Sequence, residues 1–303
     1  MKLLLTASTD VGRVREANED SYCILENQNS IYICDGMGGH VAGAHASHLA
    51  IDTIAQIQTR LNEEEFDELN TELNPSLPDF SAKMIHAIRM ANLRIFNAAQ
   101  NKSKLQGMGT TVVGISFCDG LSSIAHAGDS RAYRIRNEEI EQMTIDHSWL
   151  NELIQAGKIE QERIKNFPHR NVIIRALGVE NTLKIDLRLD PIQKDDYFLL
   201  CSDGLHDLIH DESILNTVLA YEDELEDAIN SLIFKANKAG GKDNITIALV
   251  KVVELEGPTA SFSFRDTIPE ESSTQLALEY RLLSERFGLN DDDAETRPVD
   301  IAY

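Results

Sequence analysis

The sequence predicts an α+β fold in which helices cover antiparallel β-sheets that pack face to face. Two features of the pattern favour this class. Short apolar runs separated by turn residues are typical of hairpins, and amphipathic helices occur in pairs. Strand–helix–strand alternation, the pattern of a parallel sheet, does not run through the chain. The length of 303 residues, with 42% hydrophobic and 26% charged, is enough for one large core.

The first third of the chain is predicted to hold strands and then two helices. Residues 30–34 (SIYIC) are a strand-like run that Asp35-Gly36 closes. Apolar side chains at helical spacing predict the two helices that follow. One face of the first carries Ala50, Ile54, Ile57 and Leu61, and one face of the second carries Met84, Ile88, Ala91 and Ile95. The polar residues 62–79 between them are interpreted as a surface connection.

The second half is predicted to consist mainly of antiparallel strands. From Thr110 the runs TTVVGISF, LSSIAHAG and RAYRI indicate a meander, with Asp119-Gly120 as its first hairpin turn. Residues 148–170 are predicted as short helices interrupted at Gly157 and Pro168, ahead of the strand-like NVIIRAL. There follow the strand YFLLC, a helix with an apolar face, and the strand ITIALVKVV; the helix face carries Leu225, Ile229, Leu232 and Ala236.

A change in composition near residue 253 predicts a domain boundary. Residues 1–253 are assigned to the main domain and residues 254–303 to an acidic tail that begins with a linker, EGPTASFSFRDTIPEESS. Thr267 in this linker is a hypothetical kinase site. One tail helix is predicted over about 273–287 from the spacing of Leu276, Tyr280, Leu283 and Phe287.

The composition excludes several classes of function. With 28 Lys+Arg against 50 Asp+Glu, the net charge of −22 opposes binding to nucleic acids and to anionic membranes. No apolar run approaches the roughly 18 residues that span a bilayer, and the opening MKLLLTASTD turns polar too early for a signal peptide. A cytoplasmic location is therefore expected. The scattered cysteines are interpreted as reduced core residues: Cys23, Cys34, Cys118 and Cys201.

Three aspartates stand beside glycines at the ends of predicted strands. Asp35 follows IYIC, Asp203 follows FLLCS, and Asp243 precedes NITIALV. A strand end is rigid yet open to a cleft, and glycine lets a backbone carbonyl approach a cation, so we interpret these residues as candidate metal ligands. The alternative is an ordinary turn, which stays open for either Asp-Gly pair taken alone. The glycines after Asp35 do not complete a dinucleotide-binding loop, because Val41 stands where its last glycine is required.

A guanidinium and further acids lie near the N-terminus. Arg15 is a candidate clamp for phosphate, because guanidinium pairs bidentately with phosphate oxygens. The alternative for Arg15 is a surface ion pair with Glu16 or Glu19. Asp129, between two strands of the meander, is a further candidate ligand.

In these residues the chain resembles the bacterial branch of the metal-dependent protein phosphatases, the type 2C or PPM family. The resemblance covers about residues 7–253 and implies an αββα sandwich, two antiparallel sheets flanked by antiparallel helix pairs. It makes residues 148–170 the family's flap, a segment beside the active site implicated in substrate choice. The matching segments, in order, are TDVGRVREANEDS, CDGMGGHVAG, GMGTT, AHAGDSRAYRI, IDHS, NVIIRALG, LLCSDGL and GGKDNITI.

The resemblance implies a centre of two Mn²⁺ or Mg²⁺ ions. Asp35 would bridge both ions, and the Gly36 carbonyl would reach one of them. Asp203 and Asp243 would hold the other, while Asp129 together with Asp203 would hold a third, weaker ion. Oxygen ligands without thiolates favour these hard cations over zinc.

Other site residues follow from the same resemblance. Glu19 and Asp20 would hydrogen-bond metal-bound water, and Arg15 would bind the substrate phosphate. Met37 stands where animal members of the family carry the histidine proposed as general acid, so that role is unassigned, and His40 is one candidate for it.

The expected function is that of a protein serine/threonine phosphatase, in which a hydroxide bridging two ions attacks phosphoserine or phosphothreonine. Its partners are expected to be phosphorylated proteins and an opposing Ser/Thr kinase, and the protein is expected to be a monomer. One alternative is a non-catalytic phosphoprotein-binding module, a pseudophosphatase, which would have lost metal carboxylates. A second is a phosphohydrolase for small molecules.

Overall fold

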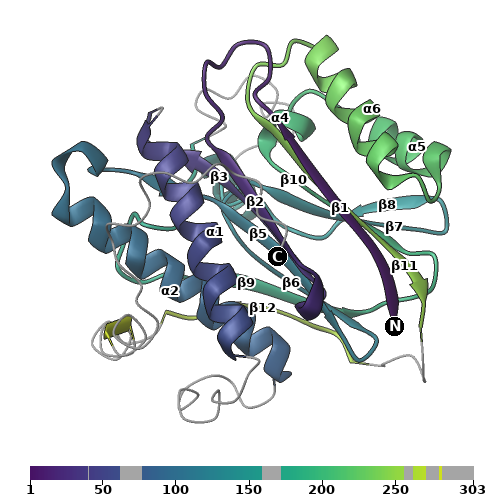
Figure 1. The fold of residues 1–303 in the computed structure, drawn as a ribbon, viewed down its shortest axis with the longest axis horizontal. Coiled ribbons are helices and arrows are strands. Elements are labelled where there is room, and N and C mark those ends of the chain that lie inside the picture. The colour runs from purple at the N-terminus through teal and green to yellow at the C-terminus, as the bar shows by residue number, and fades with distance from the viewer. Residues whose placement is uncertain (40, 62–76, 159–171, 256–261, 271–279, 282–303) are drawn as a thin grey trace.

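Two antiparallel β-sheets lie face to face in the middle of the molecule, and a pair of helices covers the outer face of each sheet (Figure 1). The computed structural model describes residues 1–39, 41–61, 77–158, 172–255, 262–270 and 280–281. These layers confirm the predicted α+β sandwich.

The first sheet has five strands in the order β1-β11-β10-β7-β8. Their bounds are β1 Lys2–Asp10, β7 Arg131–Arg136, β8 Glu139–Gln142, β10 Tyr197–Cys201 and β11 Ile245–Glu254. The second sheet has seven strands, six in the order β12-β9-β6-β5-β3-β2 and a seventh, β4, paired with β3. Their bounds are β2 Asp20–Leu25, β3 Ser30–Met37, β4 Gly109–Thr110, β5 Val112–Cys118, β6 Leu121–Ala127, β9 Ile185–Pro191 and β12 Phe264–Ile268.

Helices α1 (Val41–Leu61) and α2 (Asp79–Asn101) pack on the seven-stranded sheet, as their apolar faces predicted. Helices α5 (Asp211–Tyr221) and α6 (Leu225–Lys238) cover the five-stranded sheet. Helix α3 (Trp149–Gln155) is the first short helix predicted for residues 148–170, whereas residues 159–171 lie outside the described part of the chain. Further short elements in the described part of the chain are α4 (Asp203–His206) and the 3₁₀ turns η1 (Glu26–Gln28) and η3 (Ser103–Leu105).

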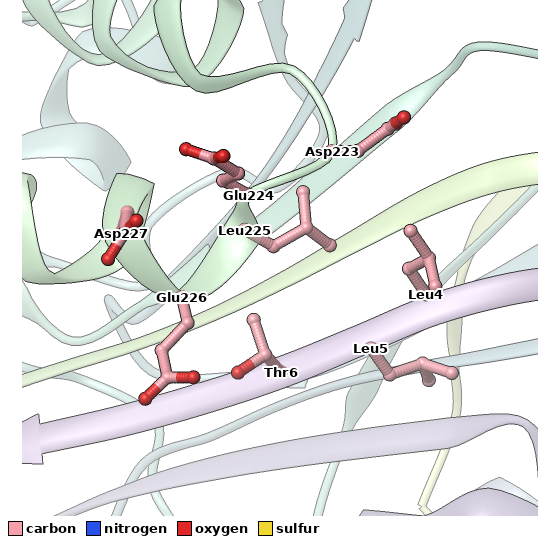
Figure 2. Close-up of a pocket in the computed structure, with 8 residues that line it drawn as sticks. All are labelled: Leu4, Leu5, Thr6, Asp223, Glu224, Leu225, Glu226 and Asp227. Atoms are coloured by element: carbon pink, nitrogen blue, oxygen red, sulfur yellow. The ribbon is translucent and has the colours of Figure 1, made fainter.

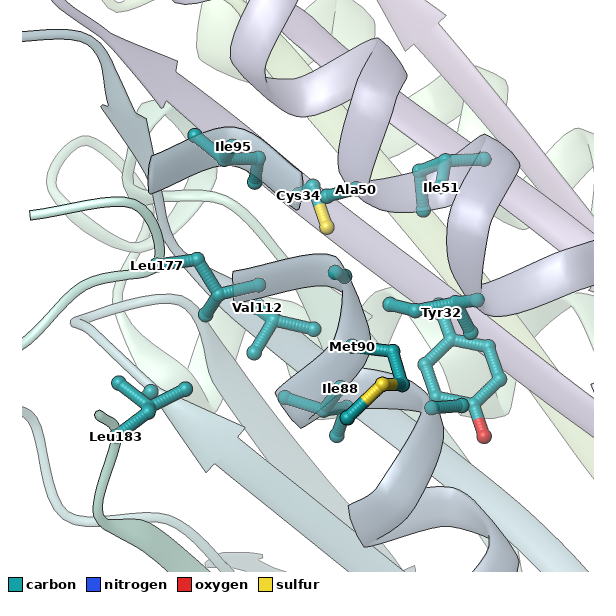
Figure 3. Close-up of a cluster of buried hydrophobic side chains, with 14 of the residues drawn as sticks. Tyr32, Cys34, Ala50, Ile51, Ile88, Met90, Ile95, Val112, Leu177 and Leu183 are labelled. Atoms are coloured by element: carbon teal, nitrogen blue, oxygen red, sulfur yellow. The ribbon is translucent and has the colours of Figure 1, made fainter. Parts of the chain in front are cut away.

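Strand β3 is apolar on both faces because each face is covered by a different part of the core. Successive side chains of a strand point to opposite faces. Ile31 and Ile33 enter the core between the two sheets, whereas Tyr32 and Cys34 enter the core under α1 and α2 (Figure 3). The run SIYIC is therefore continuously hydrophobic because β3 is buried on both sides.

The predicted meander is divided between the two sheets. Strands β5 and β6 form a hairpin through Asp119 and Gly120, whose φ angles of +49° and +76° fit the predicted turn. Strand β7, however, pairs with β8 and β10 in the other sheet. The prediction of one continuous meander was wrong here, because Gly128-Asp129-Ser130 carries the chain across the sandwich instead of turning it back.

Two other segments differ from their predictions. The run NVIIRAL forms no strand in its described part; Ile173 and Leu177 make isolated bridges to Ser148 and Thr110. Val172 and Ile174 are exposed, so β-branched composition did not indicate burial here. Residues 264–268, predicted as linker, form the edge strand β12 paired with β9. Neighbouring prolines and acids masked the β-forming residues of this short run.

Other predictions concern residues scattered along the chain. The four cysteines carry no disulfide, and three of them are buried, which agrees with their interpretation as core residues. Of the predicted tail helix, only Tyr280 and Arg281 are described, and both are helical. Within the described residues, no helix combines the length and apolar character needed to cross a bilayer.

Candidate functional site

Five aspartates, hereafter the aspartate cluster, converge where strands of both sheets end: Asp20, Asp35, Asp129, Asp203 and Asp243. The first two face each other across β2 and β3. Asp203 begins α4 two residues after the end of β10, and Asp243 stands two residues before β11, the neighbour of β10. Burial first, and then the charges of the other four, raise the pKa of Asp35 well above its usual range. The sequence-predicted ligands are thus brought together.

Two threonines fix the end of β3. The Asp35 N–H donates to Thr111 Oγ1 at 3.1 Å, and the Asp35 carbonyl accepts from Thr110 Oγ1 at 2.8 Å and from the Thr111 N–H at 2.9 Å. Thr111 Oγ1 also bonds Ser130 Oγ at 2.7 Å, next to Asp129. The crossing between the sheets is therefore joined directly to the strand end that carries Asp35.

Asn244 holds the loop between β1 and β2. Its amide donates to the carbonyls of Val11 and Ala17 at 3.0 Å each, and its Oδ1 accepts from the Glu19 N–H at 2.8 Å. Gly12, with φ +82°, lies so close that an added Cβ would be 2.3 Å from the Asp243 carbonyl oxygen. The loop that carries Arg15 and Glu19 is consequently fixed against the segment that carries Asp243.

Arg15 contacts the aspartate cluster itself. Its Nη2 donates to Asp243 Oδ2 at 2.7 Å, and this hydrogen bond raises the pKa of Arg15. An ion pair is found, as in the alternative interpretation, but its partner is a predicted metal ligand 228 positions away rather than Glu16 or Glu19 next in the loop. The Arg15 side chain is 43% exposed, so it is accessible to a ligand.

Glycines let α1 approach Asp35 and Glu19. A Cβ on Gly36 would be 2.2 Å from the Gly43 carbonyl oxygen, and a Cβ on Gly43 would be 1.9 Å from Glu19 Oε2. Glu19 is buried, and its carboxylate lies against the first turn of α1, where the helix dipole favours negative charge. Gly36 and Gly43 therefore serve close packing. His40, the candidate general acid, lies outside the described residues.

Buried carboxylate oxygens in this cluster have no hydrogen-bond partner among the described residues. They are Oδ1 of Asp20, Asp129 and Asp203. Asp20 Oδ2, in contrast, accepts from Ser202 Oγ at 2.8 Å and Thr246 Oγ1 at 2.6 Å. Burial raises the pKa of Asp20 to about 6, and burial with the charge of Asp146 raises that of Asp129 to about 6. Buried carboxylates that repel one another and lack hydrogen-bond donors are suited to binding cations, which would supply the missing positive charge.

The carboxylate oxygens of the aspartate cluster nevertheless lie farther apart than the ligands of one metal ion would. Among the described residues, ligand atoms within 4.8 Å of one another form one group of three, namely His126, His147 and Asp186, outside the aspartate cluster. No three carboxylates of the aspartate cluster meet this spacing. Like charges favour such separation, and Arg15 holds Asp243 by an ion pair.

Sequence analysis missed residues that support the predicted ligands. Arg131 pairs with Asp146 through bonds of 2.9 and 2.7 Å, and His206 Nε2 lies 3.1 Å from the Asp129 carbonyl oxygen. Burial lowers the pKa of His206 to about 4. These residues lie inside the segments GDSR, IDHS and SDGLHD, so the motifs signalled their importance without showing their contacts.

A separate cleft of about 470 Å³ opens between β1 and the start of α6. Figure 2 shows that acidic side chains line it together with Leu4, Leu5, Thr6 and Leu225; the acids are Asp223, Glu224, Glu226 and Asp227. Four carboxylates repel phosphate, and none of them belongs to the aspartate cluster. This cleft is therefore not the site that the sequence predicted.

Comparison with known proteins agrees with the geometry. Residues 13–238 match the family model described as Protein phosphatase 2C. The serine/threonine phosphatase Stp of Listeria monocytogenes is 36% identical over 246 residues, which is 80% of this chain and 93% of that protein.

Solved structures are similar as well. The serine/threonine phosphatase of S. agalactiae superposes with a TM-score of 0.73 at 32% identity, covering 84% of this chain and 100% of that one. The catalytic domain of the phosphatase PstP in complex with 2 manganese ions gives a TM-score of 0.68 at 33% identity, covering 83% and 99%.

Proposed function

This chain belongs to the protein phosphatase 2C family and is a protein serine/threonine phosphatase, and we propose that its aspartate cluster holds the divalent ions with which it hydrolyses phosphoserine and phosphothreonine. The ions are Mn²⁺ or Mg²⁺. Support comes from the all-oxygen donor set, the buried unpaired carboxylate oxygens, and the manganese bound by the related PstP domain.

In the proposed centre, Asp35 and the Gly36 carbonyl bind at the end of β3, and Asp203 and Asp243 bind from the facing sheet. Asp129, on the crossing between the sheets, contributes with Asp203 to a third, weaker position. Bound divalent ions supply positive charge to the substrate phosphate and lower the pKa of water so that it is a nucleophile near neutral pH.

Three further side chains act on the substrate or on water. Arg15 releases Asp243 and turns its planar guanidinium to two phosphate oxygens, which suits its accessible position. Asp20 Oδ1 and Glu19 accept hydrogen bonds from water and fix its orientation. Hydrogen bonds from Ser202 and Thr246 lock the other oxygen of Asp20, so the free one keeps a fixed direction.

The proposal extends to the protein's surroundings. We propose that the substrates are phosphorylated proteins whose Ser/Thr kinase this phosphatase opposes, and that the protein acts in the cytoplasm as a monomer, with residues 1–253 as the catalytic domain. The net charge of −22 supports the exclusion of nucleic acid and anionic membrane as partners. A phosphoprotein must then approach the one region where bound cations invert the local charge.

The observation that carries this proposal is the set of buried, unpaired carboxylate oxygens in a cluster where burial and neighbouring charges raise the pKa of Asp35 and of Asp203. The test is Mn²⁺-dependent turnover of a phosphothreonine peptide by Asp243→Asn and Asp35→Asn. We expect each to lose at least about 100-fold in kcat. Asp223→Asn, in the acidic cleft beside α6, is the matched control and keeps wild-type turnover.

Wild-type turnover in Asp35→Asn or Asp243→Asn would contradict the proposed ligands. A wild type that binds the phosphopeptide without hydrolysing it would favour the pseudophosphatase alternative. Faster turnover of sugar phosphates than of the peptide would favour a small-molecule phosphohydrolase.

A further inference from the structure

A second charged group lies between the aspartate cluster and the edge of the seven-stranded sheet. We call it the Asp186 cluster: Asp186, His126, His147, Arg175 and Thr267. Asp186 Oδ1 accepts from Arg175 Nη1 at 2.6 Å and from Thr267 Oγ1 at 2.9 Å, and Asp186 Oδ2 lies 3.3 Å from His147 Nε2. The rings of His126 and His147 stack with centroids 4.6 Å apart.

This cluster is not a metal site, although three of its members lie within 4.8 Å. The Gly128 N–H donates to His147 Nδ1 at 3.1 Å, which assigns a ring proton to Nε2, the atom that lies 3.3 Å from Asp186 Oδ2 and 3.0 Å from Arg175 Nη1. A ligating Nε2 would have to lose that proton. The guanidinium of Arg175 already supplies the positive charge. Burial raises the pKa of Asp186, but its interactions with neighbouring groups, foremost the hydrogen bond with His147, lower it more, so the pKa of Asp186 lies below the usual range.

The geometry connects Asp186 with the neighbour of Asp129. His147 contacts both backbone groups of Gly128: its ring Nδ1 accepts from the Gly128 N–H, and its backbone N–H donates to the Gly128 carbonyl at 2.9 Å. Gly128 has φ +118°, and a Cβ there would be 2.6 Å from Thr111. The ring and the backbone of His147 together therefore fix the backbone at the start of the crossing that presents Asp129.

Asp186 also joins the two ends of the predicted flap. His147 immediately precedes Ser148, the N-cap residue of α3, and Arg175 follows residues 159–171. Both contact the same carboxylate, one on each oxygen. Asp186 thus links His147, before α3, to Arg175, two residues that are 28 positions apart in the chain.

The remaining member, Thr267, comes from β12, beyond the residues that match the family model. Thr267 is the register partner of Asp186, and its hydroxyl bonds Asp186 Oδ1. The strand is anchored by buried Ile268 and by Arg89 of α2, whose Nη2 donates to the Pro269 carbonyl at 2.6 Å. A segment of the predicted tail therefore reaches the network that holds Gly128.

We propose that Thr267 is a positioning residue for the metal centre: through Asp186 and His147 it fixes Gly128, and with it the direction of Asp129. The inference rests on the proposed function, in which Asp129 binds the weaker ion. Docking of β12 then lowers the Mn²⁺ concentration that the enzyme requires, so the tail segment adjusts the catalytic domain without touching substrate. A solely structural strand, by contrast, would affect stability alone.

The test compares three variants of the full-length protein. Thr267→Val replaces the hydroxyl with a methyl group of similar size, and Thr267→Ser keeps the hydroxyl. Ser263→Ala is the matched control. Ser263 Oγ bonds the Leu189 carbonyl at 3.2 Å and Asp190 Oδ1 at 2.8 Å, so it also docks this segment on β9 but does not touch Asp186.

The first measurement is the Mn²⁺ concentration for half-maximal turnover. Because an exposed hydrogen bond to a carboxylate is modest, we expect Thr267→Val to raise it about threefold, with kcat at saturating Mn²⁺ within about twofold of wild type. Thr267→Ser and Ser263→Ala keep the wild-type requirement. An unchanged requirement in Thr267→Val, or an equal rise in Ser263→Ala, would overturn the proposal.

The second measurement is made without metal, so it does not depend on the proposed catalysis. In ¹H–¹⁵N spectra of the metal-free protein, the Gly128 amide resonance should move in Thr267→Val and keep its position in Ser263→Ala and Thr267→Ser. A Gly128 resonance that is the same in all variants would overturn the relay. Failure of the aspartate variants to lose activity would instead refute the proposed function and leave this spectrum unaffected.

Discussion

The aspartate cluster and the Asp186 cluster both place carboxylate groups near the crossing between the two sheets, but the negative charge is balanced differently in the two: five acids share the first cluster, whereas the second holds a single acid. Asp186 is surrounded by donors, because Arg175, His147 and Thr267 all reach its two oxygens. In the aspartate cluster, burial and mutual repulsion raise the pKa of Asp35 and of Asp203. An acid whose charge is already balanced stabilises the fold, whereas acids forced together without balance form a binding site for cations.

The strongest way to break this comparison is to neutralise one acid from each cluster. Asp203→Asn should lower Mn²⁺-dependent turnover at least about 100-fold, yet raise the metal-free melting temperature, because it removes repulsion worth on the order of 1 kcal/mol. Asp186→Asn should lower the unfolding free energy by about 2 kcal/mol, because Arg175 loses its charged partner. Thermal melts in a chelator measure both changes. Shifts of the same sign in the two variants would contradict the distinction.

Arg15 tests the difference between the two clusters, because its guanidinium pairs with Asp243 of the aspartate cluster although we propose that it binds the substrate phosphate. Arg15→Ala should raise KM for a phosphopeptide about tenfold and change kcat less, since the guanidinium binds phosphate before the chemical step. Arg15→Lys should restore little, because an ammonium lacks the planar fork. Arg13→Ala is the control in the same loop. If KM stays at the wild-type value, Arg15 balances Asp243 only, as Arg175 balances Asp186.

A further comparison concerns the pH dependence of stability. Burial lowers the pKa of His86 and of His126 to about 4. Between about pH 6.5 and 4 the unfolded chain therefore binds more protons than the folded one, and the unfolding free energy falls on acidification, by up to about 3 kcal/mol for each histidine. Urea unfolding across this range measures the slope.

His126 belongs to the Asp186 cluster, whereas His86 lies in α2, so each can be tested separately. His126→Gln keeps a donor for the Ile145 carbonyl, the present partner of His126 Nε2 at 3.0 Å, and should remove that histidine's share of the slope. A slope identical to wild type would show that His126 is not buried in its neutral form.

Much of this fold could be predicted from periodicity. Strand β3 and helices α1, α2 and α6 bury the faces that their apolar spacing indicated, because burial on a defined face leaves a period in the sequence. The prediction was poorer where burial is partial. Strand β12 is mostly exposed, and the unpredicted strand β9 alternates charged and apolar residues in KIDLRLD. The sequence could not predict that β7 leaves the sheet of β5 and β6, because a hairpin turn and a crossing between sheets use the same residue types.

The candidate site shows the same limit. The candidate ligands Asp35, Asp203 and Asp243 could be proposed from the sequence because strand ends and glycines mark them. Long-range hydrogen bonds leave no comparable mark: Asn244 reaches Val11 across 233 positions, and Thr267 reaches Asp186 across 81. The supporting residues therefore required the structure.

The most direct measurement is calorimetric titration of the metal-free protein with Mn²⁺, comparing wild type with Asp35→Asn and Asp223→Asn. The proposed centre predicts saturable binding of at least two ions by the wild type and by Asp223→Asn, and loss of that binding in Asp35→Asn. Identical binding curves for wild type and Asp35→Asn would contradict it.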